Sequence, residues 1–312
     1  YIAFYSTSTN LVTGDTNDAG DIFRRDTVAG TTALVSVNSS GTGPGNSYSS
    51  HPDITPDGRF IVFETQATNL FANDLNGLIQ DIVIRDMASN IVELISRNAT
   101  GTGSANDYSF LPVVSDGGRF VAFETLATNL GPTDLNIRYD VYVRDRQSGT
   151  NVLCSRNLAG TSGGDQDSYA AVLSGNGQIV LFYSVASDLV AGDTNQTGDV
   201  FAFNTLTHTR QLVSVALGGG AGNGDSSTPV ISADGRYVVF YSYATNLISG
   251  DTNSFSDIFV HDRQTGQTSR ISVDSSGIEA DSTSYNPSIS ADGRYVAFES
   301  TAANLVGGDT NN

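Results

Sequence analysis

One spacing of oxygen-bearing side chains recurs along the chain. An aspartate is followed two residues later by an asparagine and then by a second aspartate, six residues after the first or seven in the second occurrence. A sixth occurrence breaks off after Asp309 and Asn311. The five complete sets are Asp15, Asn17, Asp21; Asp74, Asn76, Asp81; Asp134, Asn136, Asp140; Asp193, Asn195, Asp199; and Asp251, Asn253, Asp257.

Carboxylate and amide oxygens at this spacing can converge on a hard cation. Calcium takes six to eight oxygen ligands, and a backbone carbonyl near the middle of each segment could add another. The EF-hand calcium-loop pattern is absent from the sequence. The alternative is that Asp and Asn hydrogen-bond their own backbone in Asx-turns and hold these loops without metal. The sequence therefore predicts structural Ca²⁺ in the five loops, with pure turn chemistry as the competing interpretation.

A further Asn or Asp lies upstream of each of these sets at a constant phase. It could be another cation ligand, or it could cap the end of a strand. The residues are Asn10, Asn69, Asn129, Asp188, Asn246 and Asn304.

Composition excludes several classes of function. The chain of 312 residues has a formal net charge of −18, and all 15 of its basic residues are arginine. Without lysine there is no Walker-A loop, no Schiff-base lysine and no kinase-type lysine. The acidic balance argues against nucleic acid as a partner. Cys154 is the only cysteine, so an intrachain disulfide and a cysteine-based zinc site are excluded. No apolar run is long enough to span a membrane.

No cluster typical of an enzyme is visible in the sequence. His51, His208 and His261 fall at three different phases of the repeat described below, so they share no site. Glutamate and tyrosine alternate at one strand position, as in Glu64 and Tyr183, and we expect this residue to hydrogen-bond between neighbouring sheets. An enzyme is therefore not favoured.

Internal repetition predicts the fold. The segment "DGRFIVFETQATNL" beginning at Asp57 recurs as "GGRFVAFETLATNL", "ADGRYVVFYSYATNL" and "ADGRYVAFESTAANL", and "GNGQIVLFYSVASDL" is a weaker copy. Repeats begin at residues 1, 60, 120, 179, 237 and 295, at intervals of 58 to 60 residues, and the last is truncated. We interpret residues 1–312 as a single domain.

Each repeat contains four short strand segments, which in the last two copies occupy residues 237–242, 257–262, 268–273 and 286–290. The Asp-Gly-Arg turns suit hairpins with a positive φ at glycine. Four antiparallel strands per repeat, apolar on both faces, predict an all-β propeller of four-stranded blades. Six blades with the sixth incomplete are expected, with five blades as the alternative. A β-solenoid fits less well, because its coils are usually shorter and lack two hairpin turns.

The pattern P-x-I-S-x-D-G-R-Y-V-A-F followed by D-I-F-V-x-D resembles the TolB-type propeller repeats, which are related to the WD-repeat propellers. The resemblance covers essentially the whole chain. It implies that "PSIS" is the innermost strand of a blade, followed outward by "YVAFES", a "DIFVHD"-like strand and "TSRISV". It implies little about function, because such propellers serve as binding platforms, peptidase gates, lyase scaffolds and surface-protein modules.

Antiparallel strands place the two tight turns of a blade on one face and the two long loops on the other. By this assignment the long loops carry twenty acidic residues, whereas ten arginines lie among the turn aspartates of the opposite face. One face should therefore be strongly negative and the other mixed. Loops are also acidic in proteins that work in salty extracellular fluid, so the charge by itself does not establish a ligand.

These features favour a non-catalytic module that is secreted, at the cell surface or periplasmic, and that uses the long-loop face to bind a protein or a glycan. Alternatives are the propeller of a hydrolase or lyase with its catalytic residues elsewhere, and a repeat module of a filament or surface layer. The first copy lacks its innermost strand and the last lacks its outer pair. We therefore expect the native polypeptide to extend beyond both ends, with self-assembly through open blade edges as a further possibility.

Overall fold

The structure is a computed structural model that describes residues 1–131 and 134–309. These residues form antiparallel β-strands joined by turns and loops, and no helix occurs among them. The chain divides into two compact units, Tyr1–Leu153 and Cys154–Asn312. Asn311, the last residue of the incomplete sixth loop, lies outside the described residues.

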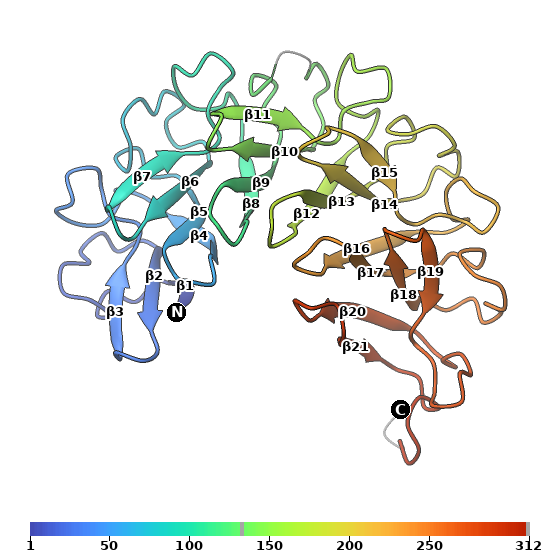
Figure 1. Ribbon diagram of the computed structural model, residues 1–312. Helices are drawn as coiled ribbons and strands as arrows, with labels where there is room; N and C mark the ends of the chain where they lie inside the picture. The colour runs from blue at the N-terminus through green and yellow to red at the C-terminus, as the bar shows by residue number, and fades with distance from the viewer. Residues whose placement is uncertain (132–133, 310–312) are drawn as a thin grey trace. The chain divides into compact units, whose positions relative to one another are not determined.

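The first unit contains three sheets whose strands follow chain order (Figure 1). Their orders are β1-β2-β3, β4-β5-β6-β7 and β8-β9-β10-β11. The strands are β1 (Ile2–Ser6), β2 (Asp21–Asp26), β3 (Thr31–Leu34), β4 (Ser49–Ile54), β5 (Phe60–Thr65), β6 (Asp81–Asp86), β7 (Ile91–Leu94), β8 (Ser109–Val114), β9 (Phe120–Thr125), β10 (Asp140–Asp145) and β11 (Thr150–Leu153).

The second unit also contains three sheets, with orders β12-β13-β14-β15, β16-β17-β18-β19 and β20-β21. The strands are β12 (Ser168–Leu173), β13 (Ile179–Ser184), β14 (Asp199–Asn204), β15 (Arg210–Leu212), β16 (Ser226–Ile231), β17 (Tyr237–Ser242), β18 (Asp257–Asp262), β19 (Gln267–Arg270), β20 (Ser284–Ile289) and β21 (Val296–Ser300). The six sheets correspond to the six predicted repeats. As expected, the first sheet lacks one strand and the last has two.

The core lies between consecutive sheets. In the first unit, β4 packs against β1 and β2, and β8 packs against β5. In the second unit, β16 packs against β12 and β13, and β20 packs against β17. Fully buried side chains from two sheets meet in each layer, such as Ile84 and Phe123, or Leu181 and Phe240. This explains why the strands are apolar on both faces, as the sequence indicated.

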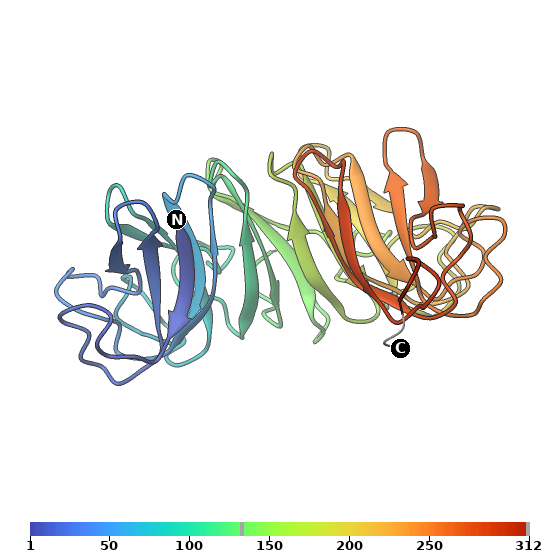
Figure 2. The same ribbon diagram turned by 90° about the horizontal axis from the view of Figure 1, so that it is seen from below.

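The predicted Asp-Gly-Arg hairpin turns are confirmed. Gly58 has φ +71°, and the Asp57 carboxylate accepts hydrogen bonds from the Thr55 hydroxyl and the Arg59 amide. Only glycine adopts this conformation readily. In Figure 2 the β18–β19 turn lies on the opposite side of its unit from the long loops.

The tight-turn face is mixed in charge, as predicted, and three of its arginines form bidentate pairs with turn aspartates. The Arg119 guanidinium donates to both carboxylate oxygens of Asp145 at 2.9 Å and lies over the Phe120 ring. This hydrogen bond lowers the pKa of Asp145 to about 2. Equivalent bidentate pairs join Arg59 to Asp86 and Arg236 to Asp262. In these three copies the pair connects the hairpin turn to the end of the neighbouring strand through two charge-assisted hydrogen bonds.

The innermost strand of each sheet after the first contains a β-bulge that the sequence pattern did not predict. The residue in the bulge has a positive φ of 46° to 54° although none of the five is glycine. These residues are His51, Leu111, Ala170, Thr228 and Asn286. Four of them precede a proline, which restricts their backbone to conformations outside the right-handed helix.

The core predicts a large effect of truncating one ring. The Phe240 side chain is fully buried and stacks on Phe259 with a centroid separation of 6.0 Å. Phe240→Ala should lower the free energy of unfolding by about 3–5 kcal/mol, because it leaves a cavity. Leu206→Ala, at a side chain 58% exposed in the same unit, should change it by less than about 0.5 kcal/mol. Urea unfolding followed by circular dichroism measures both, and equal effects would contradict this description of the core.

Candidate metal centre

Each predicted metal loop joins the second strand of a blade to the third. The last aspartate of each set is the first residue of that third strand, and its side chain is at most 1% exposed. The fold therefore removes this carboxylate from water, which disfavours its ionised form. The five residues are Asp21, Asp81, Asp140, Asp199 and Asp257.

A buried serine, which the sequence patterns did not reveal, donates a hydrogen bond to this aspartate. The Ser96 hydroxyl donates to Asp81 Oδ1 at 2.6 Å and accepts a hydrogen bond from the Ile82 amide at 3.0 Å. The same bonds join Ser36 to Asp21, Ser214 to Asp199 and Ser272 to Asp257. The signal was a serine at the end of every outer strand, in "LVSV", "LISR", "LCSR", "LVSV" and "RISV".

The first aspartate of three sets is also buried. The exposed fractions are 8% for Asp15, 4% for Asp134 and 6% for Asp193. In each of these residues Oδ1 is buried and has no hydrogen-bond partner, and the same is true of Oδ2 of Asp21 and of Asp81. Buried carboxylate oxygens without a donor are rare and costly. Turn chemistry does not account for them.

The asparagine of each set shapes the loop. Asn17 Oδ1 accepts a hydrogen bond from the Ala19 amide, which forms an Asx-turn, and Asn195 and Asn253 make the same bond. The Asn17 amide nitrogen donates to the Gly45 carbonyl of the other long loop at 2.9 Å. The turn interpretation therefore describes these asparagines well. In the second set, Asn76 Oδ1 is buried without a partner and remains available as a ligand.

Five of the six upstream residues connect two long loops, and their possible role as cation ligands stays a prediction. Asn69 Oδ1 accepts a hydrogen bond at 3.0 Å from the Asn46 amide, which lies in the long loop that joins β3 to β4. Asn129, Asp188, Asn246 and Asn304 accept the equivalent bond from Asn106, Asp165, Asn223 and Asp281. These residues tie the two long loops together.

Burial raises the pKa values of several loop carboxylates, and in two loops the charge of the first aspartate adds to the rise. Burial is the main cause at Asp81, whose pKa rises to about 7, and the charge of Asp74 adds to it. Burial likewise raises the pKa of Asp199 to about 7, with a contribution from Asp193. The pKa of Asp134 rises to about 6 through burial. In these three loops the ionised form of a buried aspartate is therefore disfavoured in the absence of a cation.

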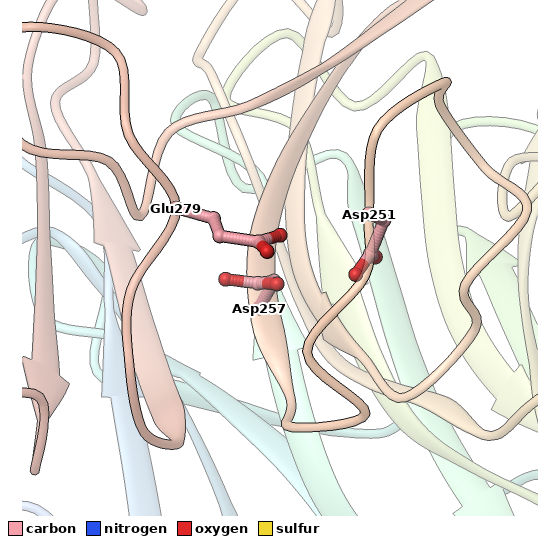
Figure 3. A group of neighbouring side chains, drawn as sticks. All are labelled: Asp251, Asp257 and Glu279. Carbon is pink, nitrogen blue, oxygen red and sulfur yellow. The ribbon is translucent and has the colours of Figure 1, made fainter.

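The fifth loop differs, because the chain places its own cation, Arg270, beside its carboxylates. Asp251, Asp257 and Glu279 have ligand oxygens within 4.8 Å of one another (Figure 3). Arg270 Nη1 lies 3.4 Å, 3.1 Å and 2.6 Å from oxygens of these three residues. The Arg270 side chain is 7% exposed. A metal ion in this loop would compete with the guanidinium, so the carboxylate cluster by itself does not mark a metal site.

The other four copies place leucine at the position of Arg270. In the paired strands, Arg270 lies opposite Phe259, as Leu212 lies opposite Phe201. Leu34, Leu94 and Leu153 occupy the same position. Glu279 is equally specific to the fifth copy, because its equivalents in the isolated bridges are Pro44, Ser104, Gly163 and Ala221. Within the described residues, no arginine forms an ion pair with Asp15, Asp21, Asp81, Asp193 or Asp199.

The expected bond between sheets at the alternating Glu/Tyr position is confirmed. Glu64 Oε1 accepts a hydrogen bond from the Leu111 amide of the next blade at 2.6 Å, and the Tyr183 hydroxyl donates to Asp225 Oδ1 at 3.1 Å. Glu64 Oε2 also lies 2.9 Å from Nδ1 of His51. His261 is buried on β18 and His208 lies in a turn, so these two belong to separate environments.

The raised pKa values predict how stability depends on pH in metal-free buffer. Asp81, Asp134 and Asp199 have folded-state pKa values of about 6–7, above the ordinary 3.8. The folded protein then binds more protons than the unfolded chain between these values. The free energy of unfolding should therefore fall as the pH rises from about 4 to about 7.

Urea unfolding at a series of pH values measures this slope. Asp81→Asn and Asp199→Asn should each flatten it, because the amide does not titrate. Asp116→Asn, at an exposed turn aspartate of the first unit, is the control and should leave the slope unchanged. A metal-free protein that becomes more stable over this pH range would contradict the assignment.

Comparisons with known proteins were made for both sequence and structure. No protein-family model and no curated protein sequence matches the chain. Among solved structures, the β-propeller domain of the trilobed protease from Pyrococcus furiosus, which has an open velcro topology, is similar with a TM-score of 0.51 and 10% identity. That match covers 90% of this chain and 70% of the other. Dipeptidyl peptidase 4 from Porphyromonas gingivalis gives a TM-score of 0.52 and 12% identity over 89% of this chain and 39% of the other.

TolB from Acinetobacter baumannii has a TM-score of 0.47 and 16% identity, over 89% of this chain and 53% of TolB, so the chain spans about half the length of that TolB. Within the described residues, no helix is long and apolar enough to cross a membrane. At these identities the similarities concern architecture alone. The chain has the predicted β-propeller fold.

Proposed function

We propose that this chain is a non-catalytic β-propeller module that is stabilised by calcium and binds a protein or glycan partner on its long-loop face. We place it outside the cytoplasm, as a secreted, cell-surface or periplasmic protein. The observation that carries the calcium proposal is the repeated pair of buried aspartates with unpartnered oxygens, as in Asp15 and Asp21.

The donor set favours calcium over softer metals. The unpartnered atoms are carboxylate oxygens in loops rich in backbone carbonyls, and calcium accepts such ligands in flexible geometry. The histidines and Cys154 lie outside these loops, so nitrogen and sulfur ligands are not offered. A bound divalent ion would offset the charge of both carboxylates and would supply the partner that their buried oxygens lack.

The fifth copy supports the same interpretation by contrast. There, Arg270 brings a positive charge to the two aspartates, and Glu279 adds a further carboxylate. We therefore limit the calcium proposal to the first four loops and assign the fifth to the guanidinium. The loop retains its shape in either case, because the Asx-turn of Asn253 is the same as that of Asn195.

Calcium removal should destabilise the protein. An ion present at 100 times its dissociation constant stabilises the folded state by about 2.7 kcal/mol per site. The melting temperature should therefore be higher in calcium than in EDTA, and equilibrium dialysis should find four ions per chain. Identical melting curves in calcium and EDTA, together with no bound ion, would contradict the proposal.

Matched variants assign the ions to loops. Asp193→Asn should remove one ion, whereas Asp251→Asn should leave the number of ions unchanged. Arg270→Leu restores the residue of the other four copies and should add a fifth ion. If Asp251→Asn removes an ion and Arg270→Leu adds none, the fifth loop binds metal despite its arginine.

Partner binding is supported by apolar side chains at the tips of the acidic loops. Leu75 is 70% exposed, Leu217 is 67% exposed and Ile278 is 58% exposed, each in a long loop. A partner on this face would bury these side chains, so they are the positions at which to test it. Loop faces of rigid scaffolds also carry binding functions in general.

Arrays of defined glycans and peptides test which face binds. For the strongest ligand found, Leu217→Ser should weaken binding roughly tenfold or more, because it removes an apolar contact on the long-loop face. Leu206→Ser is the matched control, since Leu206 is 58% exposed in the tight turn between β14 and β15 of the same blade. Loss of binding in the control variant alone would show that the tight-turn face is the one used.

A further inference from the structure

A buried arginine in the first unit has no carboxylate partner among the residues that the structure describes. The Arg85 side chain, on β6, is 7% exposed and lies between the first two sheets. Its Nη1 donates to the Val35 carbonyl at 3.3 Å and its Nη2 to Asn90 Oδ1 at 3.1 Å, whereas Nε is buried with no partner. Both partners are neutral, and burial lowers the pKa of the guanidinium. A buried charge with neutral partners alone is costly.

In the next copy, the arginine equivalent to Arg85 has a carboxylate partner. Arg144 occupies the same position on β10, and its Nε lies 3.7 Å from Glu93 Oε1. Glu93 belongs to β7 of the preceding sheet and also pairs with Arg146 at 2.8 Å. The residue equivalent to Glu93 one copy earlier is Ala33, since Glu93 lies opposite Ile84 and Ala33 lies opposite Arg24. Within the described residues, Arg85 therefore lacks the carboxylate that its counterpart has.

A cavity of about 630 Å³ opens beside this guanidinium. Its polar side is formed by Asn38, Ser39 and Asn90, and its apolar side includes Leu70, Phe71 and Ile91. Cavities of this size are typical of sites for small molecules, and polar and apolar groups line this one in similar measure. The guanidinium of Arg85 and the apolar wall both belong to this cavity within the first unit.

We propose that this cavity binds a small organic carboxylate. The carboxylate would accept hydrogen bonds from Arg85, in the role that Glu93 has for Arg144, and the apolar part would lie against Phe71 and Leu70. Charge-assisted bonds between a guanidinium and a carboxylate are among the strongest in proteins, and they give such a site its preference for an acid over a neutral analogue. The proposal is independent of calcium in the long loops.

Isothermal titration calorimetry with defined probes tests the site. Sodium hexanoate and N-acetyl-leucine carry the same carboxylate on an apolar body, one as a free fatty acid and the other as a peptide chain end. The wild-type protein should bind one or both at least tenfold more tightly than hexanamide. The tighter of the two identifies the source of the ligand. Inorganic sulfate is the control for a simple anion site, and tighter binding of sulfate than of either acid would overturn the proposal.

Two variants separate the role of Arg85 from effects on folding. Arg85→Met should lower the affinity for the acid more than tenfold. Ala33→Glu should also abolish binding, because it supplies the internal carboxylate found in the next copy. It should raise the melting temperature of the ligand-free protein for the same reason. Arg144→Met is the matched control and should leave the affinity unchanged.

Three results would refute the proposal. One is no binding of either acid at concentrations up to about 10 mM. A second is equal affinity for hexanoate and hexanamide. The third is unchanged binding in Arg85→Met or in Ala33→Glu. A melting temperature of Ala33→Glu at or below the wild-type value would also show that Arg85 does not require a counter-charge.

Discussion

Burial of an aspartate at the start of the third strand constrains every complete copy of this repeat. The position is fixed by strand pairing, because Asp81 lies opposite Thr65 and Asp199 opposite Ser184 in the central hairpin of their blades. A buried serine satisfies one oxygen of the carboxylate, as Ser96 does for Asp81. The second oxygen faces the long loop, where another aspartate lies. Since two carboxylates cannot both ionise in a dry site without a cation, each copy must either keep a proton or acquire a positive charge.

The copies balance their buried charges with different groups. Because the repeated strands and loops are equivalent, the effect of each group can be compared directly between copies. The fifth copy uses a guanidinium, and the exchange needs only the replacement of leucine by Arg270 at the end of β19. On the tight-turn face, Arg119 and Asp145 form a pair that is partly exposed, and there water reduces both the cost and the gain of the interaction. Between the sheets, Arg144 has Glu93 whereas Arg85 has none. The missing partner of Arg85 is therefore recognised by comparison with the equivalent Arg144, which has one.

The sequence was sufficient to predict the blades, because their signals are local. Strand alternation, turn glycines such as Gly58 and the 58–60-residue period depend on neighbours within one hairpin. The spacing from Asp15 to Asp21 also identified residues that come together. It did not reveal Ser36, which reaches Asp21 across 15 positions, or the role of Asn69, which joins a loop 23 residues away. Those contacts depend on how two long loops pack. Periodicity carries no information about such packing, nor about the positive φ of Leu111 in the bulge.

A consequence of repeat architecture is that each charge site is local. Among the described residues, the core layers within each unit join consecutive sheets, so a change in one long loop alters its own blade and the facing surface of the next. Arg270 could thus take the place of the leucine in a single copy without disturbing Asp193 or Asp199 in the preceding copy. A guanidinium is held covalently and remains when the cation concentration falls, whereas a bound ion is lost by mass action. If the first four loops bind calcium, as proposed above, the fifth loop should keep its structure when calcium is removed, since its cation is part of the chain.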